Sequence, residues 1–565
     1  MKPKTLILAI ILLLSLVVRL VFLNIIPVGI NNDELHFVLN AKSIFYGFTN
    51  IEGKINPFKL AEISSLIFAP IIGPLPNNLF TARLPYALIG SLSVVLIYLI
   101  TLRLSKNSTL ALISALISSI NPWSIYVSRT SFDPPLAVFF FLLTIFLLSL
   151  SKSKYILLSI LTGLLAFYSY IATKIIYFPI ITVSSYFLWQ FNHKKNGKLY
   201  LIVLISSLLL TLHFALSLSN QLVGNRIREI QTPNSEEIKD QVNLERRQSL
   251  QVPIIMEILT NKYTVYLKNF TQKYLYNFST DILFLHGDPA FTGSLWQHGY
   301  FYYIDALLLL FGLIYLYQTH PKFLAFLSCL ILLSPIPEAI RSGQSSSYVF
   351  HSSFQFPFLC IIISAGILFF WYKFSHKFFR ITLVFIYFLS FLNFIDIYFF
   401  KAPVYQPESF VFSQHLLSKY LQLETGKNKE VYVLTQEPEV LFRSYLFYTN
   451  SYQKNTFISI KNIYAQTNDN FLFNHIHFIN HHRHLPSGND FTLIYNSIHF
   501  DFQKDSSTFY ISNPADTGNI YTISRGLTCQ NLNLSTYPNN IRLKDLNLDK
   551  INENDFCQKY ITIKP

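Results

Sequence analysis

Long apolar runs alternate with short polar loops over the first 400 residues of the chain. The runs are close to 20 residues long, the length of helix that crosses a hydrocarbon core of roughly 30 Å. About eleven of them are predicted to be transmembrane helices, at 5–23, 79–104, 108–124, 134–150, 155–171, 175–191, 199–219, 301–318, 322–337, 353–372 and 380–400. The pattern therefore predicts an all-α polytopic membrane core.

The first run carries two lysines before its apolar stretch, as a signal peptide does. Its apolar stretch is long, contains Arg19 and has no small-x-small cleavage site before Asn24. We therefore expect this run to be retained as the first transmembrane helix.

Lysine and arginine gather in every second loop. The basic loops are the N-terminal segment and 103–106, 152–154, 193–198, 319–322 and 373–380. The positive-inside rule therefore predicts a cytoplasmic N-terminus and an extracytoplasmic C-terminus. The long loops 24–78 and 220–300 then lie outside, together with the shorter loops 125–133, 172–174 and 338–352.

The last part of the chain, residues 401–565, changes character. It contains short strand-like runs and one stretch with helical spacing, at 430–434, 491–496, 507–512, 520–525 and 407–423. We predict a small extracytoplasmic α/β domain after the membrane core 1–400. Its cysteines Cys529 and Cys557 could form a disulfide outside the cytoplasm, which the sequence alone leaves open.

Composition agrees with membrane class and argues against nucleic-acid binding. Hydrophobic residues make up 51% of the chain and charged residues only 13%, too few to cover a soluble protein of this size. The net charge of +14 lies mostly in short loops between apolar runs. That distribution is explained by membrane topology.

Two adjacent acids, Asp33 and Glu34, follow the first run. Asn31 can cap a helix that continues to Gly47, and acids in its first turn suit the helix dipole. That purely structural explanation competes with a functional one, in which one carboxylate is a general base at the mouth of a membrane cavity. Neighbouring helical residues point about 100° apart, so the two acids would have separate roles.

A second polar cluster is predicted on the same side of the membrane. Asp133 opens a predicted span and shares its short loop with Arg129. Three more cations, Arg83, Lys174 and Arg341, also lie at outer span ends, against the positive-inside bias. Four such cations indicate a bound anion, which in a bilayer would be a lipid phosphate.

The order of these motifs resembles a known family. "RLPYALIG", "NPWSIYVSRTSFDPPLAVFFF", "LLAFYSYIATKIIYFPI", "LFLHGDP" and "PIPEAIRSG" follow the acidic pair. The sequence resembles the bacterial relatives of the protein O-mannosyltransferases, glycosyltransferase family 39 of the GT-C superfamily. The resemblance covers roughly residues 5–400.

The resemblance implies a GT-C core with about eleven transmembrane helices in the inner membrane of a bacterium. It implies inverting transfer of a monosaccharide from a polyprenyl-phosphate donor to a protein, lipid or glycan acceptor on the extracytoplasmic face. The family's acids carry over to Asp33, Glu34 and Asp133, with Asp33 as the expected base. Its RLP arginine carries over to Arg83, and Arg129, Lys174 and Arg341 are further expected donor-phosphate contacts.

The sequence also departs from the family. Relatives often have an Arg-His pair after the Gly-Asp of the long loop, where this chain has Thr292 and Gly293. Further substrate contacts are expected at His36, Tyr170, Asp288 and His351. No obligatory cofactor is expected and no metal ligand is assigned; a divalent metal is possible, but His36 beside the acidic pair is a weak metal pattern.

Two other functions fit parts of the pattern. A polymerase or ligase of lipid-linked oligosaccharides would share the carrier and the outer-face site. A polytopic transporter is disfavoured, because charges near the bilayer midplane are scarce and no inverted repeat is seen. The sugar, the acceptor and the oligomeric state stay open at this stage.

Overall fold

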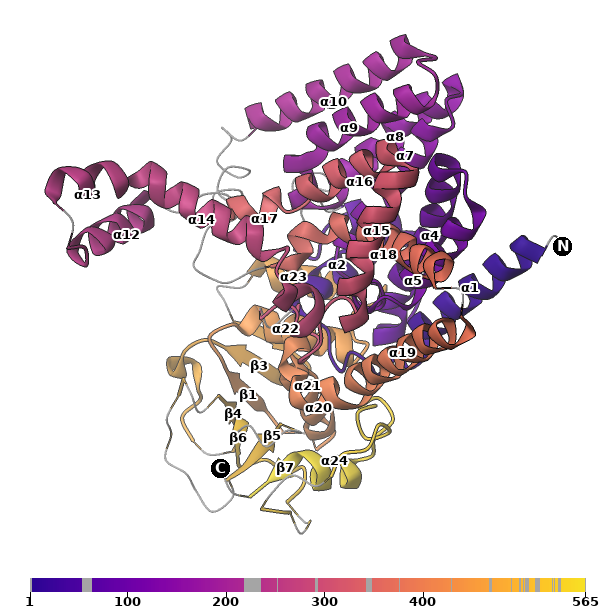
Figure 1. Ribbon diagram of the computed structural model, residues 1–565. Helices are drawn as coiled ribbons and strands as arrows, with labels where there is room; N and C mark the ends of the chain where they lie inside the picture. The colour runs from indigo at the N-terminus through magenta and orange to yellow at the C-terminus, as the bar shows by residue number, and fades with distance from the viewer. Residues whose placement is uncertain are drawn as a thin grey trace.

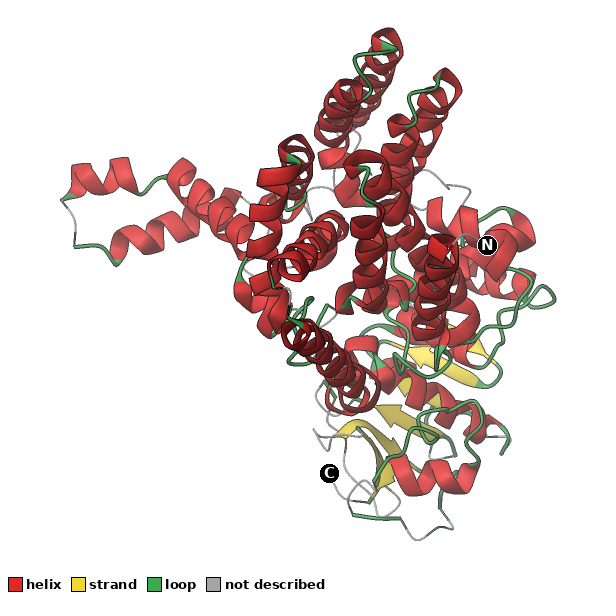
Figure 2. Ribbon diagram, turned by 45° about the vertical axis from the view of Figure 1, so that its right-hand side comes forward, coloured by secondary structure: helices red, strands yellow, loops and turns green. Residues whose placement is uncertain are grey.

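The computed structural model describes most of the chain. The described residues are 3–52, 63–217, 235–250, 252–289, 293–341, 348–374, 376–427, 429–466, 470–488, 490–496, 499–500, 502, 508–513, 519–530, 532, 534–536 and 540–563. Helices make up the upper part of the molecule and the strands gather at its lower end (Figure 1, Figure 2).

Seven helical segments among the described residues are long and apolar enough to cross a membrane. Four are single helices: α1 (Pro3–Leu20), α4 (Leu79–Ser105), α9 (Ile171–Phe191) and α10 (Gly197–Ser217). Three are composite: α16 (Pro321–Leu333) with α17 (Ile336–Ile340), η2 (Val349–Gln355) with α18 (Phe356–Lys373), and α19 (Lys377–Asp396) with η3 (Ile397–Lys401) and α20 (Ala402–Tyr405).

The remaining predicted spans are also helical. α5 (Ser108–Ile120) and α6 (Pro122–Ser128) form an eighth span if the 57° bend between them is included. α7 (Pro134–Ser149), α8 (Ser153–Ser169) and α15 (Tyr303–Thr319) are 16, 17 and 17 residues long, or about 24–26 Å at 1.5 Å per residue. All eleven predicted runs are therefore helices, but length alone supports seven or eight of them as spans.

Asparagine side chains begin several of these helices. Asn78 accepts a hydrogen bond from the backbone of Thr81, and Asn107 caps α5 in the same way. Asn121 stands at the bend between α5 and α6, where it accepts from Ser124 N and is followed by Pro122. The cap satisfies N–H groups that α6 would otherwise leave unpaired, and so the chain can turn at this depth.

The described part of the first long loop, between α1 and α4, contains two short helices, α2 (Asn32–Gly47) and α3 (Ile63–Ile72). α3 is apolar but only ten residues long, too short to span.

The second long loop forms a projecting arm, defined here as α12 (Ser235–Arg247), α13 (Pro253–Leu259) and α14 (Lys262–Tyr276). In Figure 1 the arm extends to the left, away from the rest of the molecule. The π-helical turn η1 (Asp281–Leu285) follows it and leads to α15.

The C-terminal part contains one seven-stranded sheet, in the order β2-β3-β1-β4-β6-β5-β7. β1 pairs in parallel with β3 and β4, and the outer strand pairs are antiparallel. The strands are β1 (Val431–Leu434), β2 (Phe471–Phe473), β3 (Ile476–Ile479), β4 (Thr492–Tyr495), β5 (Thr508–Ser512), β6 (Asn519–Ser524) and β7 (Ile561–Thr562). The predicted small α/β domain is confirmed.

Helices and one disulfide complete this part. The helical elements are η4 (Pro407–Phe410), α21 (Phe412–Thr425), α22 (Pro438–Tyr448), α23 (Phe457–Gln466), η5 (His482–His484) and α24 (Glu553–Tyr560). The predicted helix 407–423 corresponds to η4 and α21. Cys529 and Cys557 are disulfide-bonded, which resolves the point that the sequence left open.

The first loop packs directly against the C-terminal part. The backbone N–H of Ile30 donates to the Tyr448 hydroxyl, and Asn77 N donates to the side chain of Asn450. A Cβ at Gly29 would lie 2.2 Å from the carbonyl oxygen of Phe410, so only glycine permits this approach. The two segments thus form one continuous core around the start of α2.

Candidate active site

Glu34 is buried and fixes the start of α2. Its carboxylate accepts backbone N–H bonds from Asn31, which closes a capping box, and from Ser131 in the loop before α7. The Arg83 Nε lies 3.9 Å from the same carboxylate. Burial raises the pKa of Glu34, while Arg83 and the two N–H donors oppose the rise. Glu34 therefore joins the first loop to α4 and to the α6–α7 loop.

Asp33 is the exposed member of the pair. It lies in the first turn of α2, one residue before Glu34, and so points in a different direction. Its carboxylate is open to a reactant from the extracytoplasmic side of the predicted topology. The structure thus separates the two acids, as the helix geometry predicted.

Asp133 is buried at the start of α7, between the first loop and the spans. Its side chain makes no capping bond to α7, and instead accepts a hydrogen bond from the Ser64 hydroxyl of α3. Asp133 therefore ties α3 to α7 beside the cavity described next.

Aromatic side chains lie on two sides of His351. The ring of His351 lies 5.7 Å from that of Tyr170 and 4.9 Å from that of Tyr348. Burial, reinforced by the charges of Asp33, Asp288 and Asp133, raises the pKa of the Tyr348 hydroxyl. A small cavity beside them is lined by Pro134, Tyr170, Thr173, His351, Ser353 and further apolar residues.

Glu338 holds Arg341, Tyr348 and His351 together. It was not identified as a site residue from the sequence. Its buried carboxylate accepts from Arg341 Nε at 3.2 Å, lies 3.1 Å from His351 Nδ1 and accepts from Tyr348 N at 3.0 Å. Glu338 belongs to the motif "PIPEAIRSG", in which only Arg341 was chosen because it was the cation.

Asp288 connects the second long loop to the segment that contains Tyr348 and His351. Its carboxylate accepts the backbone N–H of Val349 at 2.8 Å, directly beside Tyr348. Asp288 is buried, so it positions the segment that carries His351. Thr292, one of the departures from the family pattern, lies outside the described residues.

The four expected phosphate contacts have unequal positions. Arg83 and Arg129 are fully buried. Arg83 donates to the carbonyl oxygens of Pro27 and Gly29, and Arg129 to those of Val18, Arg19 and Ile26. These guanidinium groups stabilise the segment that links α1 to α2, and they present no exposed N–H to a ligand in this structure.

Lys174 and Arg341 have fewer backbone partners in the described part of the chain than these two arginines. Lys174 Nζ is buried and has no hydrogen-bond acceptor among the described residues; it lies 5.7–5.8 Å from the ring centres of Phe167, Tyr168 and Phe214. The side chain of Arg341 is 17% exposed beside Glu338. These two cations therefore have more capacity for an anion than the two buried arginines.

His36 faces the C-terminal part. One ring nitrogen lies 2.9 Å from Asn40 Nδ2 and the other 3.2 Å from Arg443 Nη1 of α22. Arg443 also pairs with Glu52 at 3.3 Å. His36 thus joins the first loop to α22, and no trio of His, Cys, Asp or Glu arranged for a metal is found within the described ranges.

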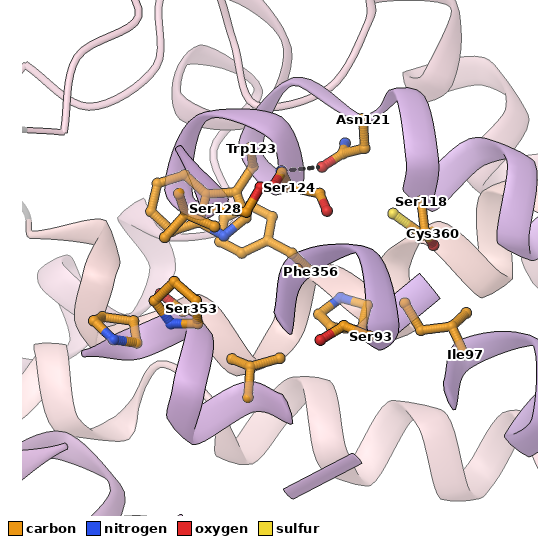
Figure 3. Close-up of a pocket in the computed structure, with 16 residues that line it drawn as sticks. Ser93, Ile97, Ser118, Asn121, Trp123, Ser124, Ser128, Ser353, Phe356 and Cys360 are labelled. Atoms are coloured by element: carbon orange, nitrogen blue, oxygen red, sulfur yellow. Dashed lines mark hydrogen bonds between the residues drawn. The ribbon is translucent and has the colours of Figure 1, made fainter. Parts of the chain in front are cut away.

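A larger pocket lies behind Pro134, deeper among the helices (Figure 3). It is partly open and shares Pro134, Val138 and Ser353 with the small cavity. Its polar lining consists of hydroxyl and amide groups, labelled in Figure 3 as Ser93, Ser118, Asn121, Ser124, Ser128 and Ser353. No charged side chain lines it among the described residues.

Known proteins resemble the chain in part. The archaeal oligosaccharyltransferase AglB from Archaeoglobus fulgidus, solved in complex with an inhibitory peptide and a dolichol-phosphate, matches at 10% identity over 80% of this chain and 64% of that one, with a TM-score of 0.44. The Archaeoglobus fulgidus oligosaccharyltransferase in complex with Zn and sulfate matches at 12% identity over 79% of this chain and 61% of that one, with a TM-score of 0.41. ArnT from Cupriavidus metallidurans in the apo state matches at 9% identity over 92% of this chain and 97% of that one, with a TM-score of 0.47. At TM-scores below 0.5 these likenesses do not bear on chemistry.

The chain spans less than two thirds of the length of the two archaeal chains. No curated protein matches the sequence. Residues 84–275, about a third of the chain, match the family model of oligosaccharyl transferase STT3, N-terminal. This match supports the prediction of a GT-C membrane glycosyltransferase that uses a polyprenyl-phosphate-linked donor, through a different family from the one that the motifs resemble.

Proposed function

We propose that the protein transfers a sugar from a polyprenyl-phosphate donor to an acceptor on the extracytoplasmic face of a bacterial inner membrane. The observation that carries the proposal is the exposed Asp33 carboxylate in the first turn of α2, next to the buried Glu34 that ties this turn to α4 and to the α6–α7 loop. The match to the STT3 family model supports the class of reaction.

In the proposed reaction Asp33 is the general base. An acceptor hydroxyl is a weak nucleophile, and a carboxylate within hydrogen-bond reach can remove its proton as the new glycosidic bond forms. The anomeric carbon is attacked from the face opposite the lipid phosphate, so its configuration inverts. The lipid phosphate leaves as an anion and needs no proton.

The leaving phosphate is stabilised by cations. Arg341 and Lys174 are the proposed contacts, because Arg341 is partly exposed and Lys174 Nζ has no hydrogen-bond acceptor in the described part of the chain. Fixed charges aimed at developing charge are usually the largest single contribution to catalysis. Glu34, Arg83 and Arg129 hold the surrounding backbone. Arg83 and Arg129 could contact the phosphate directly only if their guanidinium groups left the backbone carbonyl oxygens that they bind.

Asp133, Tyr170, Asp288 and His351 form the proposed surroundings of the sugar. Tyr170 Oη is buried without a hydrogen-bond partner among the described residues and lines the small cavity, so it can meet a sugar hydroxyl. The reaction needs no obligatory cofactor; a divalent metal remains compatible with the exposed Asp33. The acceptor is a protein, lipid or glycan.

A second candidate is transfer of a preassembled oligosaccharide. The matched family model is that of an oligosaccharyl transferase, and it covers residues 84–275. Such an enzyme would use the same lipid carrier and the same outer face. The two functions differ in the size of the donor glycan, so a comparison of donors separates them.

The test uses purified full-length protein in sealed vesicles. Radiolabelled polyprenyl-phosphate monosaccharides and polyprenyl-pyrophosphate oligosaccharides are supplied with a mixture of membrane glycans and peptides as acceptors. Label transferred covalently from the monosaccharide donor supports the proposal, and transfer from the oligosaccharide donor alone supports the second candidate. Label that accumulates in the vesicles without covalent transfer would indicate transport and would refute both.

Matched variants assign the activity to this site. Asp33→Asn is expected to abolish most transfer, whereas Asp240→Asn on the arm removes another exposed outer-side acid and is expected to be silent. Equal loss in both variants would mean that the effect is not specific to Asp33.

A further inference from the structure

The tip of the arm is an uncovered apolar surface. α13 has no buried residue, and Ile254 and Ile258 are 72% and 65% exposed. Leu250, Val252, Ile255 and Leu259 are exposed beside them. Burial of apolar area is favourable by roughly 25 cal/mol per Å², so a contiguous surface of this kind indicates an interaction site.

α14 continues this surface as a stripe along one face. Tyr263, Leu267, Phe270 and Tyr274 follow each other at spacings of four, three and four residues, which places them on the same side of a helix. Tyr263 and Leu267 are exposed, and the rings of Phe270 and Tyr274 stack at 6.1 Å. We call these four residues the α14 stripe.

The other side of α14 is polar and already has a partner. Asn269 donates to Gln241 at 2.9 Å, and Lys268 donates to Glu245 at 3.1 Å. Val265 is buried on that side. α12 therefore covers the polar face of α14 and leaves the α14 stripe open.

The α14 stripe joins the surface that faces lipid. Its last residue, Tyr274, donates from its hydroxyl to the carbonyl oxygen of Leu332 at 2.8 Å. Leu332 belongs to the span Pro321–Ile340, and its side chain is 53% exposed. The apolar surface of the arm is thus continuous with that of a span near its outer end.

The position and the residue types of the arm suit a membrane surface. The arm extends away from the rest of the molecule in both Figure 1 and Figure 2, so the rest of the molecule does not cover its tip. Tyrosine and basic residues beside the apolar tip, such as Tyr263, Tyr266, Arg246, Arg247 and Lys262, are the types that anchor a helix at headgroup level.

We propose that the arm lies in the outer leaflet of the membrane that the protein spans, with α13 and the α14 stripe facing the hydrocarbon and α12 facing water. The partner is therefore a lipid surface. The arm also reaches the candidate site, because Lys273 at its base donates to the carbonyl oxygen of Arg341 at 2.7 Å.

The test measures the depth of labelled positions in the full-length protein in phosphatidylethanolamine–phosphatidylglycerol vesicles. Cys329 and Cys360 are first replaced by alanine, and the disulfide is left intact. A nitroxide is then attached at a single new cysteine in place of Ile258, Leu267 or Gln272. Gln272 is the matched control, because it is exposed on the face of α14 opposite the stripe.

Nitroxides at positions 258 and 267 are expected to collide more often with oxygen, which concentrates in hydrocarbon, than with a water-soluble nickel complex. At Gln272 the nitroxide is expected to collide more often with the nickel complex than with oxygen. Water-like ratios at all three positions would overturn the proposal. Spectral broadening between copies at Leu267, lost on dilution with unlabelled protein, would overturn it in favour of a second copy of this chain.

A scan of every position from 263 to 274 keeps the test informative if one variant misfolds. A period of 3.6 residues in the ratio, with its maximum at the stripe, supports the proposal. A periodic ratio that never reaches the hydrocarbon range would overturn it, because the arm would then be folded in water.

Discussion

Asp33 and Glu34 are neighbours of the same charge, and their structural surroundings predict opposite effects of the same chemical change. Asp33→Asn and Glu34→Gln each replace one carboxylate oxygen by an amide nitrogen. Asp33 is exposed, whereas Glu34 is buried with both oxygens accepting backbone N–H groups. The pair therefore separates catalysis from stability.

Glu34→Gln is expected to reduce the free energy of unfolding. One side of the new amide carries hydrogens, so the N–H of Asn31 or Ser131 would face a donor in place of an acceptor. A buried N–H left without an acceptor costs about 1–3 kcal/mol. Arg83 also loses its nearby carboxylate, and breaking a buried charge pair by removing one partner brings the loss to about 3–5 kcal/mol.

Asp33→Asn is expected to leave stability unchanged and to reduce turnover. A general base contributes roughly 10²–10⁴ to the rate, and asparagine cannot take up the proton. Donor affinity should change little, because the proposed phosphate contacts lie on other segments. Asp133→Asn is measured beside these variants as the competing assignment of the base.

The assays are thermal unfolding in one detergent, transfer rate with labelled donor and donor affinity, all on matched preparations. Near-normal turnover of Asp33→Asn would refute Asp33 as base and move the role to Asp133. Unfolding of Glu34→Gln at the wild-type temperature would refute the structural role of Glu34. A normal result for both would contradict the organisation of this site altogether.

Three further predictions follow from other parts of the structure. Arg341→Lys keeps the charge but loses the planar, bidentate group, so donor affinity measured by titration should fall. If Arg341→Lys and Arg341→Ala both leave donor affinity unchanged, Arg341 does not contact the donor phosphate. A cysteine in place of Asn196 should react only after the cytoplasmic side is opened, and one in place of Asn450 should react from outside; the reverse pattern contradicts the topology. Reduction of the Cys529–Cys557 disulfide should lower the free energy of unfolding of the C-terminal part by roughly 3–4 kcal/mol, for a loop of 28 residues, and a transition unaffected by reductant would contradict this.

The membrane core was predictable because its signal is local and long. Runs of about 20 apolar residues fix a helix wherever lipid excludes water from the backbone. The exact count was less accessible, since α7, α8 and α15 are short for a span. In the C-terminal part four of the seven strands were predicted, and β2, β3 and β7 were missed. β2 and β7 have only three and two residues, too few for a periodic pattern.

The sequence predicted which residue types form the candidate site better than it predicted which of their side chains are buried. The sequence points to Asp33 and Asp133 as acids near outer span ends and, through the family resemblance, to Asp288 and His351 as substrate contacts. In the structure His351 lies beside Tyr348, and the next residue, Val349, donates its backbone N–H to Asp288. Sequence gives no measure of which cation is exposed, so Arg83 was grouped with Arg341 although its side chain is buried.

Two residues of the site were missed for the same reason. Glu338 is one acid in an apolar stretch, and its role depends on groups ten and thirteen residues away. Arg443 lies more than 400 residues after its partner His36, a pairing that no local pattern can show.

The buried arginines near the first span constrain how the nascent chain is assembled. Arg19 of α1 donates to Ser15 in its own helix, but its other acceptors are Ser118 O, Ser119 O and the Ser124 hydroxyl, about a hundred residues later. An unpaired guanidinium is costly in hydrocarbon. The first span is therefore expected to stay beside the insertion machinery until the third has been synthesised, so that the helices enter the lipid together.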